Sequence, residues 1–157
     1  MKTVLLTIGK TDDNALAQLI DVYCKRINFY IPFELEIIAE IKNTKNLSEK
    51  EQRVREGSQL LKALQPSDYV VLLDDKGRLF SSMEFAQYVE KKTHSVTKRL
   101  VFVVGGAYGF SDAVYDRANE KMSLSKMTFT HQMARLVFVE QLYRAMTILN
   151  NEPYHHE

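Results

Sequence analysis

Residues 123–131 read SLSKMTFTH and lie between a short apolar run and a long amphipathic segment. The stretch has neither the alternation of a strand nor the periodicity of a helix, and it is too apolar for an ordinary exposed turn. It overlaps MSLS (residues 122–125), a candidate last strand, and leads into a predicted helix from about His131 to Asn150. A non-periodic apolar segment between two regular elements indicates a loop with a specific task.

Outward from this loop, strands and helices alternate along the chain. Apolar runs predict strands at 3–9, 33–41, 69–74 and 100–106, and periodicity or capping residues predict helices at 13–30, 48–64, 81–94 and after residue 111. Pro66 ends the second helix, and DKGR (residues 75–78) predicts a turn. The alternation predicts a single α/β domain over residues 1–157, with a mostly parallel sheet covered by helices on both faces.

Composition restricts the class of protein. The chain of 157 residues is 45% hydrophobic and 26% charged, which is ordinary for a soluble globular domain. No apolar run is long enough to span a bilayer, and the N-terminal MKTVLLTIGKTDD lacks the pattern of a signal peptide. The lone Cys24 excludes an internal disulfide framework and a CxxC motif. We therefore expect a cytoplasmic protein with no membrane partner.

The charge balance gives no indication of a nucleic-acid partner. The net charge is +1, from 21 Lys and Arg against 20 Asp and Glu, whereas a domain that binds nucleic acid by charge is usually strongly basic. A local basic patch, particularly one assembled across an oligomer, stays compatible with this balance. HExxH, GxSxG, P-loop and Cys/His metal spacings are all absent, so we expect no metal site and no P-loop nucleotide hydrolysis.

Three segments lie at the carboxyl ends of predicted strands: LLDDKG (72–77), VVGGAYG (103–109) and SLSKMTFTH. In an open α/β sheet, ligands bind outside the carboxyl ends of the strands. Gly105, Gly106 and Gly109 would allow positive φ and close backbone approach to a ligand, although GGxxG fits a structural turn equally well. Asp74 and Asp75 have side chains that can serve as metal ligands or as a general base, but paired acidic residues after a strand more often form a solvated turn.

The last predicted helix carries several candidate residues. His131 opens it and either caps it or contacts a ligand. Arg135 and Arg144 lie nine residues apart, and we expect both to point the same way, towards solvent. An apolar face of the same helix fits a core or a dimer seam, formed by Phe138, Leu142 and Tyr143.

The C-terminal PYHHE (153–157) has two readings. Termini are usually poorly ordered, so a mobile end is the simpler one. In the other, Tyr154 and His155 fold over a site, where an aromatic ring could stack on a base and an imidazole could move a proton.

Taken together, VVGGAYGF (103–110), SLSKMTFTHQMARLVFVEQLYRA (123–145) and PYHHE resemble the ribosomal RNA large-subunit methyltransferase H family, which belongs to the SPOUT class. The resemblance runs from LLTIGK (5–10) to the end of the chain. It implies a SPOUT-type fold with a C-terminal trefoil knot, an exception to the rule that chains are unknotted. Residues 123–131 would then be the knotted loop that wraps the cofactor, S-adenosyl-L-methionine.

The resemblance also implies which residues contact that cofactor. An adenine ring needs a flat apolar slot with a few backbone hydrogen bonds at its edge, and displacement at a methyl carbon requires no metal. The implied contacts are Leu73, Gly105, Leu124, Ser125, Lys126, Met127, Thr128 and Phe129.

By the same resemblance, the reaction is methylation of N3 of a pseudouridine in 23S rRNA of the assembled ribosome, with no DNA partner. The enzyme would be a homodimer, with the knot regions and last helix at the interface and the tail of one subunit near the cofactor of the other. We assign substrate positioning to His131 and Arg144, and base contact or proton handling to Tyr154 and His155.

One position departs from the family pattern. Thr130 stands where the family commonly has proline, and we expect it to act as N-cap of the last helix instead. Two alternatives stay open: a knotted methyltransferase that modifies another RNA, and a ribosome-binding dimer without catalysis. A dehydrogenase would need a dinucleotide fingerprint, and the sequence has none.

Overall fold

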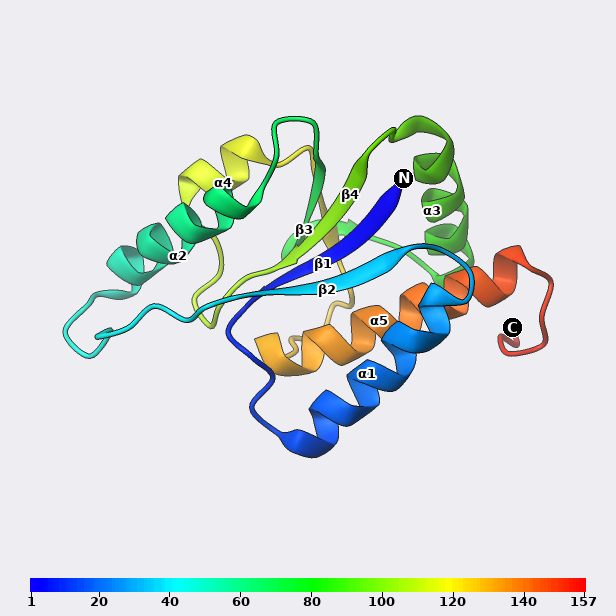
Figure 1. Ribbon diagram of the computed structural model, residues 1–157, viewed down its shortest axis with the longest axis horizontal. Coiled ribbons are helices and arrows are strands. Elements are labelled where there is room, and N and C mark those ends of the chain that lie inside the picture. Colours follow the sequence, from blue (N-terminus) through cyan, green and yellow to red (C-terminus); the bar gives the residue numbers. More distant parts are fainter.

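The computed structural model describes residues 1–157 and contains five strands and five helices in alternation (Figure 1). In chain order they are β1 (Lys2–Ile8), α1 (Asn14–Asn28), β2 (Phe33–Ile38), α2 (Glu49–Ala63), β3 (Tyr69–Leu79), α3 (Ser82–Ser95), β4 (Arg99–Val104), α4 (Asp112–Arg117), β5 (Glu120–Ser123) and α5 (His131–Leu149).

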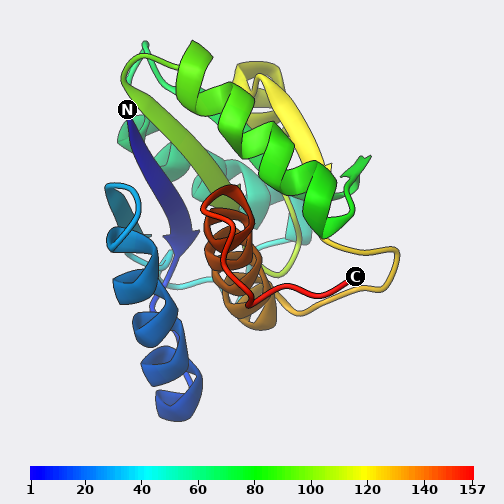
Figure 2. The same ribbon diagram turned by 90° about the vertical axis from the view of Figure 1, so that its right-hand side faces the viewer.

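The strands form one sheet in the order β2-β1-β4-β3-β5, and every strand pairing is parallel. The carboxyl ends of all strands therefore lie along the same edge. Helices α1, α3 and α5 cover one face of the sheet and α2 and α4 cover the other (Figures 1 and 2). The predicted α/β architecture, with a parallel sheet covered on both faces, is confirmed.

Alternate strand residues build the two cores. Leu5, Val71 and Phe102 are fully buried beneath α1, α3 and α5, whereas Leu6 and Val103 are buried beneath α2 and α4. Because both faces of the central strands are covered, these strands read as continuous apolar runs rather than alternating ones.

The helices begin at the residues that their capping patterns indicate. Asp13, Ser48, Ser81, Ser111 and Thr130 are N-caps, and each side chain accepts a hydrogen bond from the backbone N–H three residues on. The expected capping role of Thr130 is confirmed. No helix combines the length and apolarity that crossing a bilayer requires.

Several predicted boundaries were wrong. DKGR is no turn, because β3 continues to Leu79 after a register shift between Leu73 and Arg78. The shift needs Gly77, where an added Cβ would lie 2.5 Å from the backbone of Met122. β2 ends at residue 38 instead of 41, and β5 covers 120–123 instead of 122–125; boundaries depend on pairing partners that a local pattern does not contain.

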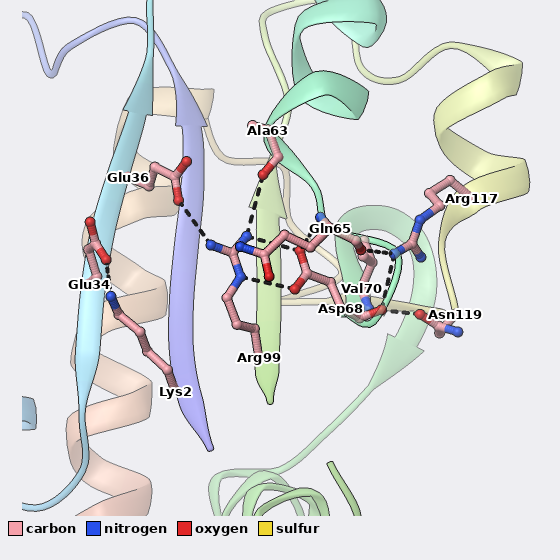
Figure 3. A network of polar contacts seen from close by, with 10 residues as sticks. All are labelled: Lys2, Glu34, Glu36, Ala63, Gln65, Asp68, Val70, Arg99, Arg117 and Asn119. Atoms are coloured by element: carbon pink, nitrogen blue, oxygen red, sulfur yellow. Dashed lines mark hydrogen bonds and ion pairs between the residues drawn. The ribbon is translucent and has the colours of Figure 1, made fainter. Parts of the chain in front are cut away.

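A polar network joins the amino ends of the strands (Figure 3). Arg99, at the start of β4, donates from Nε and Nη2 to the two carboxylate oxygens of Asp68, both at 2.9 Å. Nη1 of Arg99 also lies 3.7 Å from Glu36 of β2, and Arg117 donates to the carbonyl oxygen of Gln65 at 2.9 Å. The network fastens one edge of the sheet, and the opposite edge carries the candidate site.

Candidate active site

Two adjoining cavities lie where β3 and β4 end, against residues 123–130. Their volumes are about 740 Å³ and 110 Å³. Between them they are lined by every predicted cofactor residue except Lys126. The residues that line both are Leu73, Asp74, Asp75, Thr128, Phe129 and Ala134.

The loop between β5 and α5 is irregular, as its lack of periodicity predicts. Ser123 donates from Oγ to the carbonyl oxygen of Ser125 at 2.8 Å, and the Oγ of Ser125 accepts from the backbone N–H of Met127 at 2.9 Å. These bonds hold the loop while its apolar side chains stay open to solvent, with Met127 77% and Phe129 37% exposed. Exposed apolar side chains at the mouth of a cavity favour a ligand or a partner.

The three glycines after β4 are required for different reasons. Gly109 has a φ of 80°, and only there is the expected positive φ found. At Gly105 an added Cβ would lie 3.0 Å from the ring of Phe110. At Gly106 it would lie 2.6 Å from the carboxylate of Glu56, a buried side chain of α2 whose pKa is raised by burial. Close packing beneath the turn therefore requires glycine at positions 105 and 106. No local motif in the sequence indicates this role of Glu56.

Asp74 and Asp75 differ in environment. Asp75 is exposed, as expected, although it lies within β3 and not in a turn. The carboxylate of Asp74 accepts hydrogen bonds from the hydroxyl of Tyr115 and, at 2.8 Å, from the backbone N–H of Lys76. Burial opposes its ionisation, but the bonds from Tyr115 and Lys76 prevail and lower the pKa of Asp74. No three His, Cys, Asp or Glu side chains lie close enough together to hold a metal ion.

His131 lines the larger cavity from the first position of α5. Since Thr130 caps the helix, the imidazole is left to face the cavity. Burial and then the positive charge of Arg135 lower the pKa of His131. A neutral imidazole can accept a proton or a hydrogen bond at neutral pH.

The expected solvation of Arg135 was wrong. Nine residues are about two and a half helical turns, so Arg135 and Arg144 leave α5 on opposite sides. Arg135 is fully buried, and its guanidinium donates to the carbonyl oxygens of Ile8 and Gly9, both at 2.8 Å, and to Oγ1 of Thr11 at 3.2 Å. Its partners are backbone and hydroxyl oxygens, with no carboxylate in bonding distance.

Arg144, Tyr154 and His155 form a second cluster around Glu140. Nη2 of Arg144 lies 2.7 Å from Oε1 of Glu140, which also accepts from the hydroxyl of Tyr154 at 3.0 Å. Nη1 of Arg144 lies 3.1 Å from Nδ1 of His155. The bond to Glu140 raises the pKa of Arg144, and burial together with hydrogen bonding raises the pKa of Tyr154. The tail therefore packs against α5.

This second cluster lies apart from the cavities. Thirteen residues separate His131 from Arg144, a helical rise of about 20 Å, and neither cavity is lined by Arg144, Tyr154 or His155. One chain alone does not bring together the four predicted catalytic residues. Their catalytic roles stay predictions, as do the cofactor contacts and the threading of the chain into a knot.

Comparison with known proteins agrees with the resemblance. The family described as "Predicted SPOUT methyltransferase" matches residues 1–155. Proteins named "Ribosomal RNA large subunit methyltransferase H" are 65% identical in Parabacteroides distasonis, 58% in Phocaeicola vulgatus and 57% in Flavobacterium psychrophilum, each over 157 residues and all of both chains. On this similarity along its full length, the chain belongs to the ribosomal RNA large-subunit methyltransferase H family of SPOUT methyltransferases.

Proposed function

We propose that this chain transfers a methyl group from S-adenosyl-L-methionine to N3 of a pseudouridine in 23S rRNA of the assembled ribosome. It would act in the cytoplasm as a homodimer, with residues 1–157 of each subunit forming a single domain. The printed name of the relatives supports the class of RNA. The observation that carries the proposal is the pair of cavities at the carboxyl ends of β3 and β4, closed on one side by the loop 123–130.

The cavities suit the cofactor in size and in lining. The larger one, at about 740 Å³, lies within the range of about 300–1,000 Å³ typical of ligand sites. Leu73, Leu124, Met127 and Phe129 offer apolar walls for an adenine ring. Gly105 also lines the larger cavity, and Phe110, whose ring would lie 3.0 Å from a Cβ at this position, keeps the residue free of a side chain.

The reaction requires the protein's own residues to orient the base and to remove a proton from it. When bound, S-adenosyl-L-methionine supplies a methyl carbon on a positively charged sulfur, so attack by N3 forms the N–C bond as the C–S bond breaks and its electron pair passes to sulfur. N3 of the neutral base carries a proton that must leave. This proton would pass to a ring nitrogen of His131, which lines the cavity and is shifted towards its neutral form, or to His155 of the tail while His131 orients the base.

The remaining predicted catalytic residues would come from the second subunit. Arg144, Tyr154 and His155 lie near the far end of α5 from their own cavity. A two-fold arrangement that sets the two α5 helices antiparallel would bring the tail of one subunit to the cavity of the other. In that arrangement Tyr154 and His155 contact the base or its proton, and Arg144 holds the tail in place.

Titration of S-adenosyl-L-methionine into the purified protein tests the cofactor site. Phe129→Ala removes an exposed ring of the cavity wall, and we expect the Kd to rise about tenfold or more, because the ring supplies apolar contact area. Phe29→Ala is the matched control, since Phe29 is 84% exposed and lies at the end of α1. An unchanged Kd for Phe129→Ala would refute the assigned slot.

Tail variants test the catalytic assignment. Tyr154→Phe and His155→Ala should keep the affinity for S-adenosyl-L-methionine and lose methyl transfer to ribosomes that lack the modification, because in the proposed dimer both residues contact the base or its proton and not the cofactor. Full transfer by both variants would refute the role of the tail. Cofactor binding without transfer to any RNA by the unaltered protein would favour the non-catalytic alternative.

A further inference from the structure

Helices α2 and α4 lie on the face of the sheet opposite α5 (Figure 1). Residues of these two helices line a third cavity, of about 520 Å³. We call it the α2–α4 groove. It is continuous with the active-site edge, because Tyr108, Phe110 and Tyr115 line both this groove and the larger active-site cavity. The other side chains that line it come from α2 and from the start of α4.

The groove carries unpaired positive charge. Lys50 is exposed and Arg53 half-buried, and neither takes part in an ion pair, while Asp112 is the only acidic side chain in the lining. Asp112 lies in the first turn of α4, where unpaired backbone N–H groups favour a carboxylate. Residues 42–62 comprise the segment before α2 and all of α2 except its last residue. They include six basic and three acidic residues, in a chain whose net charge is only +1.

The groove also offers aromatic and apolar surface. Tyr108, in the glycine turn, is 42% exposed, and Val54 on the opposite wall is 54% exposed. An exposed ring next to cations is the combination that binds single-stranded nucleic acid, because the ring stacks on a base and the cations contact phosphates.

We propose that the α2–α4 groove binds the RNA strand next to the target nucleotide. This rests on the proposed function. An enzyme that modifies a base must take it out of the stack and into its pocket, so the adjoining backbone must cross the mouth of that pocket. Lys50 and Arg53 contact the phosphates of this strand, and one unstacked neighbouring base lies on the ring of Tyr108.

Charge removal tests the phosphate contacts. In steady-state methyl transfer to ribosomes that lack the modification, Lys50→Ala/Arg53→Ala should raise the KM for ribosomes about tenfold and reduce the slope of log affinity against log salt by about one to two. The Kd for S-adenosyl-L-methionine should not change. Arg55→Ala/Lys62→Ala is the matched control, because it removes two exposed cations from the same helix outside the groove; its KM should stay within about twofold of the unaltered protein.

The stacking contact has its own pair of variants. Tyr108→Phe keeps the ring and should keep the KM for ribosomes, whereas Tyr108→Ala should raise it about tenfold, since stacking of a base on an aromatic ring contributes about 1–3 kcal/mol. A photoreactive amino acid in place of Ser58, an exposed residue of the groove, should crosslink to 23S rRNA.

Three results would overturn the proposal. They are an equal KM for the two double variants, an equal KM for Tyr108→Ala and Tyr108→Phe, and a crosslink from position 58 to a ribosomal protein instead of RNA. Failure of the proposed function looks different. In that case the unaltered protein binds S-adenosyl-L-methionine but labels no ribosomal RNA, and the inference falls with the function.

Discussion

Arg135 donates from Nη2 to the carbonyl oxygen of Ile8 at 2.8 Å, so the first turns of α5 are fastened to the last residue of β1. A second bond, to the carbonyl oxygen of Gly9, holds the guanidinium in place. His131 lies one turn before Arg135 and faces the larger cavity. The position of His131 relative to the sheet therefore depends on a buried arginine that does not itself line the site.

Replacing Arg135 should cost stability. Arg135→Met preserves much of the side-chain volume but leaves the acceptors at Ile8, Gly9 and Thr11 without their donor, and we expect the free energy of unfolding to fall by about 3 kcal/mol. Urea denaturation measures this. Arg55→Met, at an exposed position of α2, should change stability by no more than about 0.5 kcal/mol. Equal stability of Arg135→Met and the unaltered protein would show that the buried charge contributes nothing net.

His131 should titrate below its ordinary pKa of 6.5. Burial and Arg135 disfavour the protonated form in the folded protein, whereas the unfolded chain binds the proton more readily. The contribution of this group to stability is therefore present above pH 6.5 and is lost as pH falls from 6.5 through the lower folded pKa. NMR titration of the imidazole, identified by its absence in His131→Gln, checks the midpoint. A midpoint above 6.5 would contradict the assigned environment.

Gly106→Ala should weaken cofactor binding. The new methyl group would lie 2.6 Å from Oε2 of Glu56, so the turn beside the cavity must move or the buried carboxylate must shift. We expect a penalty of about 1–3 kcal/mol, seen by calorimetry as a higher Kd for S-adenosyl-L-methionine. Adding Glu56→Ala should recover part of the affinity, because it removes the clash. Ala15→Ser, at an exposed position of α1 that lines neither active-site cavity, is the control, and a Kd of Gly106→Ala equal to that of the control would oppose the role of this packing.

Mixing two inactive variants tests whether subunits share a site. His131→Ala and Tyr154→Phe damage opposite ends of α5. If the tail serves the partner's cavity, a mixed dimer has one site with both defects and one with neither. Random exchange should then restore about one quarter of the unaltered activity. If each tail serves its own chain, every site carries one defect and mixing restores nothing. Methyl transfer after subunit exchange separates the two.

Much of the fold follows from local patterns in the sequence. Apolar runs such as 100–106 predict strands covered on both faces, although this strand ends at Val104, and Ser81 with Glu84 predicts a helix start that forms with both reciprocal hydrogen bonds. The irregular loop 123–130 is predicted because it has no period. These features can be predicted because each depends only on residues that are close together in the sequence.

The errors concern contacts between distant parts of the chain. Arg135 bonds to a carbonyl oxygen 127 residues earlier in the sequence, and nothing near Arg135 marks it as buried. β3 continues through a segment typical of a turn because β5 pairs with it beyond Gly77. The tail, for which the sequence left two interpretations open, packs because Glu140, fourteen residues before Tyr154, accepts a hydrogen bond from its hydroxyl. Local spacing does not determine any of these pairings.

The most direct measurement is transfer of labelled methyl from S-adenosyl-L-methionine to ribosomes that lack the modification, with the labelled nucleotide mapped. Assembled ribosomes and free large subunits are compared in parallel. We predict label on N3 of a pseudouridine in 23S rRNA, mainly in assembled ribosomes. Label on a different nucleotide or only on another RNA, or no label from a protein that binds the cofactor, would contradict the proposed function.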